Sequence, residues 1–180
     1  MKIGLIVGSL RKESWNKKIA LEVKELLEGK AEAEFIDISN VGFYNQDLDG
    51  KDEEYTKLRE AIADKDAFMF FTPEYNRSYA PAIKNAIDIG STNPKGNLWA
   101  KKPASVFSAS IGGFGGMAGN HALRNTFNYV DIIDMKQPEV YLSKVQDLYE
   151  DGKLNDGTKD FLKSAVDAFI AHAEMVNANK

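Results

Sequence analysis

The chain alternates short apolar runs with longer segments in which apolar residues recur every three or four positions. The apolar runs cover residues 2–7, 33–38, 67–71 and 104–109. The first and third runs are nearly free of polar residues, which is typical of strands buried on both faces. Because each run is followed by a segment with helical periodicity, the pattern predicts β-α units whose strands pair in parallel through right-handed crossovers.

Start and stop signals frame the expected helices. These helices cover residues 14–29, 53–64, 81–90, 117–130 and 158–176. Gly29 is placed to end the first helix in a left-handed conformation, and Pro81 suits a first helical turn, where its missing N–H costs nothing. The fifth strand is formed either by residues 132–133 or by residues 140–142, and we favour a short pairing that includes both sides of Pro138.

Three connections are expected at the surface. Residues 43–48 combine aromatic and turn-forming residues, and they form either an ordered loop across one end of the sheet or a plain surface connection. Residues 91–102 are rich in turn signals, with Trp99 as the exception, and residues 147–157 are charged and turn-rich.

Composition narrows the class of protein. With 180 residues the chain has the size of one domain, spanning residues 1–180, and its 43% hydrophobic and 28% charged residues are those of an ordinary globular protein. We expect cytoplasmic residence, since the N-terminus is a strand and no apolar run reaches the roughly 20 residues of a membrane span. A net charge of −4 argues against nucleic-acid binding. With no cysteine and only two distant histidines, redox chemistry requires a bound cofactor, and a metal site is not expected.

The stretch from Gly8 to Asn16 joins the first strand to the first helix. The unpaired N–H groups and the dipole at a helix N-terminus favour an anion, and Ser9, Arg11 and Ser14 add hydroxyls and a planar cation. The stretch lacks the glycines of a dinucleotide or triphosphate loop, so a monophosphate ester such as FMN fits better. The alternative is that Ser14 only caps the helix and that Arg11 is solvated surface.

Two further loops follow buried strands. Residues 72–81 are polar, aromatic and stiffened by proline. Residues 110–116 contain four glycines, which would let the backbone approach a flat ligand. The alternative is that residues 110–116 are a flexible linker. In a parallel sheet the loops after the first, third and fourth strands emerge at the same carboxyl edge. We therefore expect one crevice, with phosphate in the first loop and a planar ring between the other two.

These loops resemble the motifs of the NADPH-dependent FMN reductase family. The matching residues are Gly8-Ser9-Leu10-Arg11, Ser14 and Asn16, then Pro73-Glu74-Tyr75-Asn76, Ser78, Pro81 and Lys84-Asn85-Ala86-Ile87-Asp88, then Ser110, Gly112, Gly115 and Gly116. The resemblance, from Lys2 to about Pro138, implies a flavodoxin-like α/β fold with a doubly wound, five-stranded parallel sheet and helices on both faces. It also implies bound FMN and a homodimer or homotetramer. Family members include quinone, azo-dye and chromate reductases.

Carried onto this chain, the resemblance implies which residues contact the flavin. They are Ser9, Leu10, Arg11, Ser14, Trp15, Asn16, Pro73, Glu74, Tyr75, Asn76, Ser78, Ser108, Ala109, Ser110 and Gly112. The side chains assigned to the phosphate are Ser9, Arg11, Ser14 and Asn16. The chain departs from the family at Ile89, where relatives often have tryptophan, and at Tyr79 and Ala82, which relatives often replace by smaller residues; these departures bear on the nicotinamide or substrate side.

We expect NADPH or NADH to reduce the flavin and leave before a quinone, an azo compound, chromate or free flavin takes the electrons in the same place. No side chain is required as a nucleophile or base, and we interpret Glu74 as structural. The alternative is a flavodoxin-like carrier that passes single electrons to a protein partner, although such carriers are usually more acidic. A flavin-binding regulatory module without turnover is a third possibility.

Overall fold

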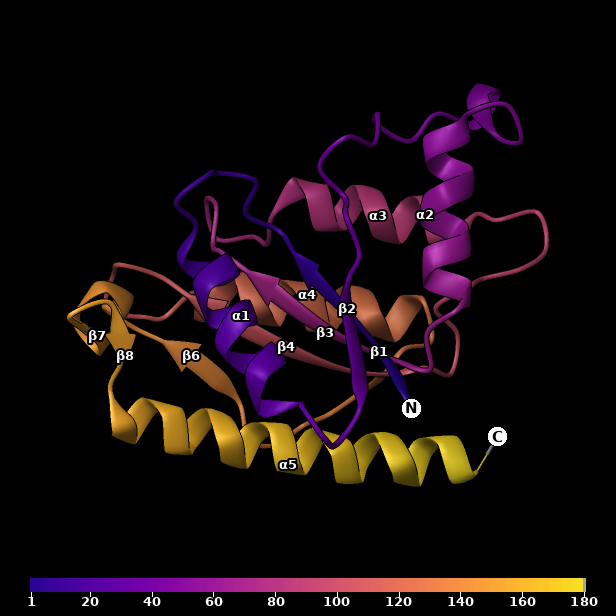
Figure 1. Cartoon of the computed structure of the whole chain (residues 1–180). Coiled ribbons are helices and arrows are strands. Elements are labelled where there is room, and N and C mark those ends of the chain that lie inside the picture. Colours follow the sequence, from indigo (N-terminus) through magenta and orange to yellow (C-terminus); the bar gives the residue numbers. More distant parts are fainter. Residues whose placement is uncertain (180) are drawn as a thin grey trace.

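The computed structural model describes residues 1–179, and its central feature is a parallel sheet between two layers of helices (Figure 1). The strands are β1 (Lys2–Val7), β2 (Glu32–Phe35), β3 (Ala67–Thr72), β4 (Pro103–Ala109), β5 (Ile133–Asp134) and β6 (Val140–Leu142). The sheet order is β2-β1-β3-β4-β5, and β6 also pairs with β4, so two short segments share the fifth position. The expected pairing on both sides of Pro138 is confirmed.

Five helices cover the sheet. They are α1 (Trp15–Leu26), α2 (Glu53–Ala63), α3 (Pro81–Ser91), α4 (Met117–Tyr129) and α5 (Asp156–Ala178). The α1 and α5 helices pack on one face, and α2, α3 and α4 pack on the other. In Figure 1 the long α5 helix runs along the face opposite α3. Within residues 1–179 no helix is long and apolar enough to cross a membrane.

The continuous apolar runs result from burial on both faces. Along β3, Met69 and Phe71 pack toward α1 and α5, whereas Phe68 and Phe70 pack toward α2, α3 and α4. All six residues of this strand are buried. Because successive side chains of a strand point to opposite faces, a strand between two helical layers needs an apolar residue at every position.

The Trp99 side chain belongs to the core on the sheet face that α2, α3 and α4 cover. It is fully buried, it donates a hydrogen bond from Nε1 to the carbonyl of Ile87 at 3.0 Å, and it packs edge-on against Phe68. A Cβ added to Gly90 would lie 2.4 Å from the Trp99 Nε1 atom, so α3 needs a glycine where it meets this ring. The connection at residues 91–102 is therefore anchored in the core by the residue that stood out in its sequence.

Two boundaries differ from the sequence prediction. The β2 strand ends at Phe35 and not at residue 38, because Asp37 accepts a hydrogen bond from the N–H of Ser39 and turns the chain away from β1. The α1 helix ends at Leu26, and Gly29 has a left-handed φ of 75° in the turn that follows it.

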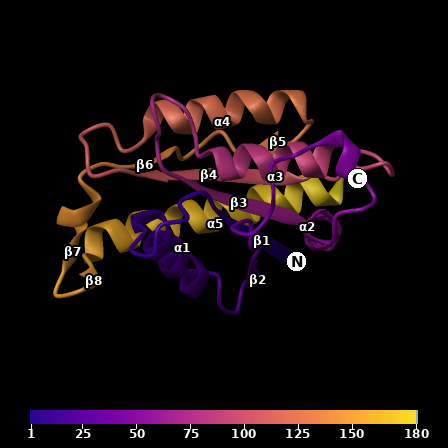
Figure 2. The same ribbon diagram turned by 90° about the horizontal axis from the view of Figure 1, so that it is seen from above.

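Residues 147–157 lie mostly at the surface, as expected, but they do not form a plain loop. The 3₁₀ helix η2 (Val145–Leu148) leads into a hairpin of β7 (Tyr149–Glu150) and β8 (Lys153–Leu154), which lies near the beginning of α5 (Figures 1 and 2). The turn residues Asp151 and Gly152 have φ values of 49° and 79°, the left-handed pair that a two-residue hairpin turn requires. The Asp-Gly pair was the sequence signal for this hairpin. The α5 helix then begins at Asp156 and not near Thr158, with Asn155 as its cap.

Candidate functional site

The loops that follow β1, β3 and β4 are bonded to one another at the carboxyl edge of the sheet. These three strands are adjacent in the sheet, so their ends lie side by side. A Cβ on Gly8 would lie 2.6 Å from the Cβ of Ala80, which shows how closely the first loop approaches the start of α3. The predicted convergence of the three loops is confirmed.

The first loop presents a run of backbone donors. Among residues 1–179, no acceptor is found for the backbone N–H groups from Ser9 to Asn16. The Ser14 hydroxyl caps α1 by accepting from the N–H of Lys17 at 3.1 Å, and it keeps its own hydrogen for another acceptor. The Arg11 guanidinium is exposed and forms no ion pair within the described range. This donor set suits a dianionic phosphate.

The Asn16 side chain has a different role from the phosphate donor we expected. Its Nδ2 donates to the carbonyl of Ala109 at 3.2 Å, and its Oδ1 accepts from the N–H of Ala109 at the same distance. Both residues are buried. This reciprocal pair fastens the first loop to the end of β4, so Asn16 shapes the site mainly through its bond to Ala109.

The second loop is a tight hairpin-like turn on a fixed base. Tyr75 and Ser78 exchange backbone hydrogen bonds of 2.8 and 3.0 Å, and the intervening Asn76 and Arg77 have left-handed φ values of 50° and 67°. At the base, the buried Thr72 hydroxyl donates to the carbonyl of Pro73 and accepts from the N–H of Ala80. The turn therefore fixes the backbone of Tyr75, whose ring is half-exposed at the edge of the site.

The Glu74 carboxylate caps α4. Its Oε2 accepts from the backbone N–H groups of Ala118 and Gly119 at 3.0 and 3.3 Å, while Gly116, the residue before the helix, supplies no side-chain cap. A Cβ on Gly119 would lie 2.9 Å from the carbonyl oxygen of Ser78, so the second loop rests directly on this helix. Because its carboxylate accepts two hydrogen bonds from the start of α4, Glu74 joins the second loop to this helix, which supports the structural interpretation.

In the third loop, some polar groups are hydrogen-bonded within the protein and others are left unpaired within residues 1–179. The Ser108 hydroxyl donates to the carbonyl of Val140 and accepts from Asn120, and the Ser110 hydroxyl accepts from the N–H of Gly112 at 3.0 Å. In contrast, no acceptor is found in the described chain for the N–H groups of residues 111 and 113–115. The loop thus offers backbone N–H groups, whereas Ser108 and Ala109 are used to build it.

Glycine is required where this loop approaches its neighbours. A Cβ on Gly115 would lie 2.6 Å from the backbone carbon of Tyr141, and Gly115 has a left-handed φ of 59°. The N–H of Ser110 donates to the carbonyl of Leu142, and the N–H of Lys144 donates to that of Gly112. The third loop is therefore held against β6 and the segment after it, which argues against a flexible linker.

Three polar residues of the site were not predicted from the sequence. Thr72 fixes the second loop, and Asn120 links α4 to β4 by donating to the carbonyl of Val106 and to Ser108. Asn85 appeared only as part of a motif; it accepts from the N–H of Tyr44 and donates to the carbonyl of Gly42. Asn120 could have been found as a polar residue on the apolar stripe of α4, three positions before Leu123.

The departures from the family motifs lie mostly in the core. Ile89 is fully buried, and its carbonyl accepts from Arg59 Nε. The Tyr79 hydroxyl lies 2.9 Å from Thr126 Oγ1, and burial raises the pKa of this phenol. Ile89 and Tyr79 are therefore part of the core, although we expect these departures to bear on the nicotinamide or substrate side. Ala82, which is only partly buried, lines a cavity beside the second loop.

Comparison with known proteins identifies the family. Residues 1–147 match the model of the NADPH-dependent FMN reductase family. The chain belongs to this family. It is 40% identical over 179 residues to a quinone reductase from Pseudomonas putida KT2440, covering 98% of this chain and 96% of that protein. It is 36% identical over 159 residues to an NAD(P)H-dependent FMN reductase from Pseudomonas aeruginosa, covering 87% and 85% of the two chains.

Solved structures agree with this assignment. The flavoenzyme NAD(P)H:(acceptor) oxidoreductase FerB from Paracoccus denitrificans superposes with a TM-score of 0.90 at 36% identity, covering 97% of each chain. A flavodoxin from Pseudomonas aeruginosa superposes with a TM-score of 0.62 at 15% identity, covering 97% of this chain and 99% of that one, which shows the fold alone. As a member of the NADPH-dependent FMN reductase family, the protein is an NAD(P)H-dependent oxidoreductase that uses FMN.

The chemistry of the three loops fits FMN. The unpaired N–H groups and Arg11 suit the terminal phosphate, and the exposed N–H groups of the third loop suit the polar edge of the ring. Large apolar side chains lie exposed on these loops and on the segment after β2. They are Leu10, Phe43, Tyr75, Ile111, Phe114 and Met117, which we call the apolar rim. Within the described residues no group of acidic or histidine side chains could hold a metal ion.

Replacing Asn16 tests the bond between the first loop and β4. Asn16→Ala removes both hydrogen bonds to the buried N–H and carbonyl of Ala109. We expect the free energy of unfolding to fall by about 2–3 kcal/mol, measured by urea denaturation. Asn125→Ala is the matched control, because Asn125 is exposed on a helix and should change stability by less than about 0.5 kcal/mol. Equal stabilities of the two variants would contradict the proposed role.

Proposed function

We propose that this protein is an FMN-dependent NAD(P)H:quinone oxidoreductase in which the three loops hold the flavin. The observation that carries the proposal is the run of unpaired N–H groups beside Arg11, at the edge where the second and third loops converge. The quinone is proposed as acceptor because the relatives that match almost the whole chain include a quinone reductase. Azo compounds, chromate and free flavin are further candidate acceptors.

We assign the residues of the flavin site in two groups. The phosphate would be held by the backbone from Ser9 to Asn16, by the Arg11 guanidinium and by the hydroxyls of Ser9 and Ser14. The ring would lie beside residues 73–76 and 110–112, where the Tyr75 ring supplies an aromatic surface and the third loop supplies N–H donors. Ser108 and Ala109 would support this site from behind, since their polar groups are bonded to Val140, Asn120 and Asn16.

The protein would contribute position and electrostatics to the reaction. FMN, when bound, supplies the exchange of a hydride between NAD(P)H and the acceptor. The N–H groups of the third loop would stabilise negative charge on the ring edge, because fixed dipoles need no reorganisation during the reaction. Glu74 would keep its cap on α4 throughout, so no side chain acts as a base. The donor would leave before the acceptor enters, since both need the open face of the ring.

We also propose that residues 1–180 form one flavin-binding domain that assembles as a homodimer or homotetramer. Both helical layers pack on the same sheet, which supports a single domain. The apolar rim supports assembly, because clustered exposed apolar side chains often mark an interface. Within this rim, Ile111 and Phe114 are 66% and 69% exposed.

Steady-state turnover tests the activity. The FMN-loaded protein should oxidise NADPH when a benzoquinone is present, and double-reciprocal plots at several quinone concentrations should give parallel lines. Free FMN at the same concentration is the control. A rate no higher than that of free FMN would contradict the proposal. A protein that accumulates one-electron-reduced flavin on photoreduction without oxidising NADPH would instead be an electron carrier.

Arg11→Ala tests the phosphate site. Loss of a charge-assisted hydrogen bond of about 1.5–3 kcal/mol should weaken FMN binding by roughly 10- to 100-fold, measured by the recovery of flavin fluorescence on dilution. Lys12→Ala is the control, because Lys12 is an exposed neighbour in the same loop. If Arg11→Ala retained FMN as tightly as the control, Arg11 would not hold the phosphate.

Sedimentation velocity tests the assembly. The wild type should sediment as a dimer or tetramer, and replacing both Ile111 and Phe114 by serine should shift it toward the monomer, because the interface would lose its apolar centre. Tyr129→Ser is the control, since Tyr129 is 93% exposed but lies at the far end of α4. A wild type that is monomeric at micromolar concentration would overturn this part of the proposal.

A further inference from the structure

A groove runs along the outer side of the first loop, between this loop and the segment that follows β2. It consists of two adjoining cavities of about 420 and 400 Å³ that share Leu10, Arg11, Ile38 and Ser39. One end is lined by Tyr75 and Phe43, and the other by Lys17, Phe35 and Asp37. Each cavity lies in the range of roughly 300–1,000 Å³ that is typical of small-molecule sites.

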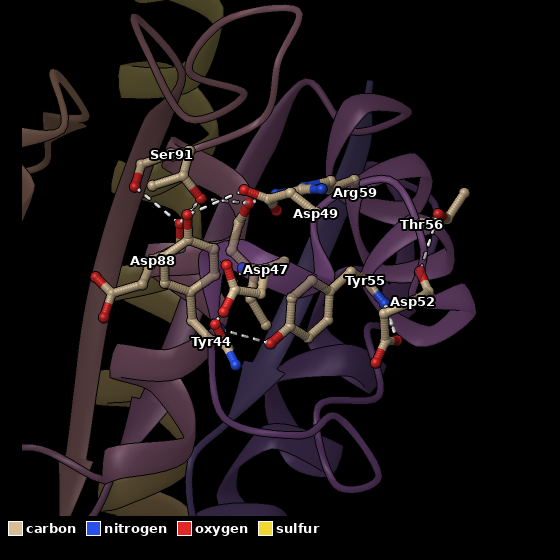
Figure 3. Close-up of polar contacts among 12 residues, drawn as sticks. Tyr44, Asp47, Asp49, Asp52, Tyr55, Thr56, Arg59, Asp88 and Ser91 are labelled. Atoms are coloured by element: carbon tan, nitrogen blue, oxygen red, sulfur yellow. Dashed lines mark hydrogen bonds and ion pairs between the residues drawn. The ribbon is translucent and has the colours of Figure 1, made fainter.

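The wall opposite the first loop is held in place by polar contacts. Asn85 on α3 bonds to the N–H of Tyr44 and to the carbonyl of Gly42. Figure 3 shows the Tyr44 and Tyr55 rings near the Arg59–Asp49 pair. The Tyr55 hydroxyl donates to the carbonyl of Phe43 at 2.6 Å, and Arg59 pairs with Asp49 at 2.6 Å. These bonds fix the Phe43 backbone while its side chain remains 84% exposed at the groove.

The far end of the groove contains an ammonium group without an ion-pair partner. The Nζ of Lys17, in the first turn of α1, lies 3.2 Å above the centre of the Phe35 ring, and within residues 1–179 it forms no ion pair. Burial lowers the pKa of Lys17, although Asp37 opposes this effect. Hydrogen bonds from Ser39 engage Asp37 and lower the pKa of its carboxyl. A ligand that carries a phosphate would supply the partner that Lys17 lacks.

The end of the groove that Lys17 and Asp37 line lies at the carboxyl edge of the sheet. Lys17 and Asp37 meet at the carboxyl end of β2, one strand away from the loop assigned to the FMN phosphate. In doubly wound nucleotide-binding folds, the residue that follows the second strand meets the adenosine ribose, where an acid favours the free 2′-hydroxyl and a cation favours a 2′-phosphate. The groove leads from there to Tyr75, beside the place assigned to the flavin ring.

We propose that this groove binds the nicotinamide donor, with its nicotinamide end at Tyr75 and Phe43, its pyrophosphate beside Ser39, and the 2′-phosphate of NADPH on Lys17. The inference rests on the proposed function, and it deepens that function by making Lys17 and Asp37 opposing determinants of donor choice. Lys17 attracts the 2′-phosphate, which distinguishes NADPH from NADH, and the Asp37 carboxylate repels it. The Asp37 carboxylate is already engaged by Ser39, whereas Lys17 forms no ion pair within residues 1–179, so NADPH is the preferred donor.

Variants at these two positions should change donor choice in opposite directions. In the FMN-loaded protein, Lys17→Gln should lower the ratio of kcat/KM for NADPH to kcat/KM for NADH about tenfold, the effect of one lost charge-assisted hydrogen bond. Asp37→Asn should raise this ratio about threefold, because a repelling charge at the groove is removed. Lys17→Arg should keep the ratio near that of the wild type. Lys18→Gln is the matched control, since Lys18 is the exposed neighbour on the same helix.

A binding measurement separates this inference from the activity itself. By calorimetry, adenosine 2′,5′-bisphosphate should bind the wild type about tenfold more tightly than it binds Lys17→Gln, while adenosine 5′-monophosphate should show no such difference. If the wild type oxidises neither NADPH nor NADH, the proposed function fails. If it turns over normally but Lys17→Gln and Lys18→Gln have the same donor ratio and the same affinity for the bisphosphate, only the groove assignment fails.

Discussion

The parallel pairing of β1, β3 and β4 is the constraint on which the site depends. Because all three strands run in the same direction and lie next to one another, the loops that follow them all begin at the same edge of the sheet. Burial on both faces fixes their register, since a shift of one residue would exchange the two faces of every strand. Three segments far apart in the sequence are thereby brought together before any of their own side chains interact.

Polar contacts then convert this proximity into a shaped site. The bonds of Asn16 to Ala109, of Glu74 to the start of α4 and of Thr72 to the base of the second loop each join one loop to another element. The side chains of Asn16, Glu74 and Thr72 are therefore hydrogen-bonded within the protein. What remains for a ligand is mainly backbone N–H, which is fixed in direction and carries no net charge, with Arg11 and Lys17 as the cations at the outer side.

The sequence predicted the sheet and the loops well because both follow from local pattern. Continuous apolar runs identified β1 and β3, and Pro81 marked the start of α3. The β2 boundary was missed because it depends on an Asx turn at Asp37, and the β7–β8 hairpin was missed because the Asp-Gly signal lay within a charged segment. The partner of Asn16 lies 93 residues away. The local sequence does not show whether such an amide binds a ligand or another part of the protein, because this depends on which residues the fold brings close to it.

The first turns of α1 and α2 differ in charge. The α2 helix has Asp52 as its cap and two glutamates in its first turn, as the helix dipole favours. The α1 helix has a neutral cap and no acid in its first turn, and Lys17 lies where a cation is unfavourable by about 0.3–1 kcal/mol. A phosphate bound at this terminus would offset this unfavourable interaction, because an anion is attracted both by the helix dipole and by a nearby cation.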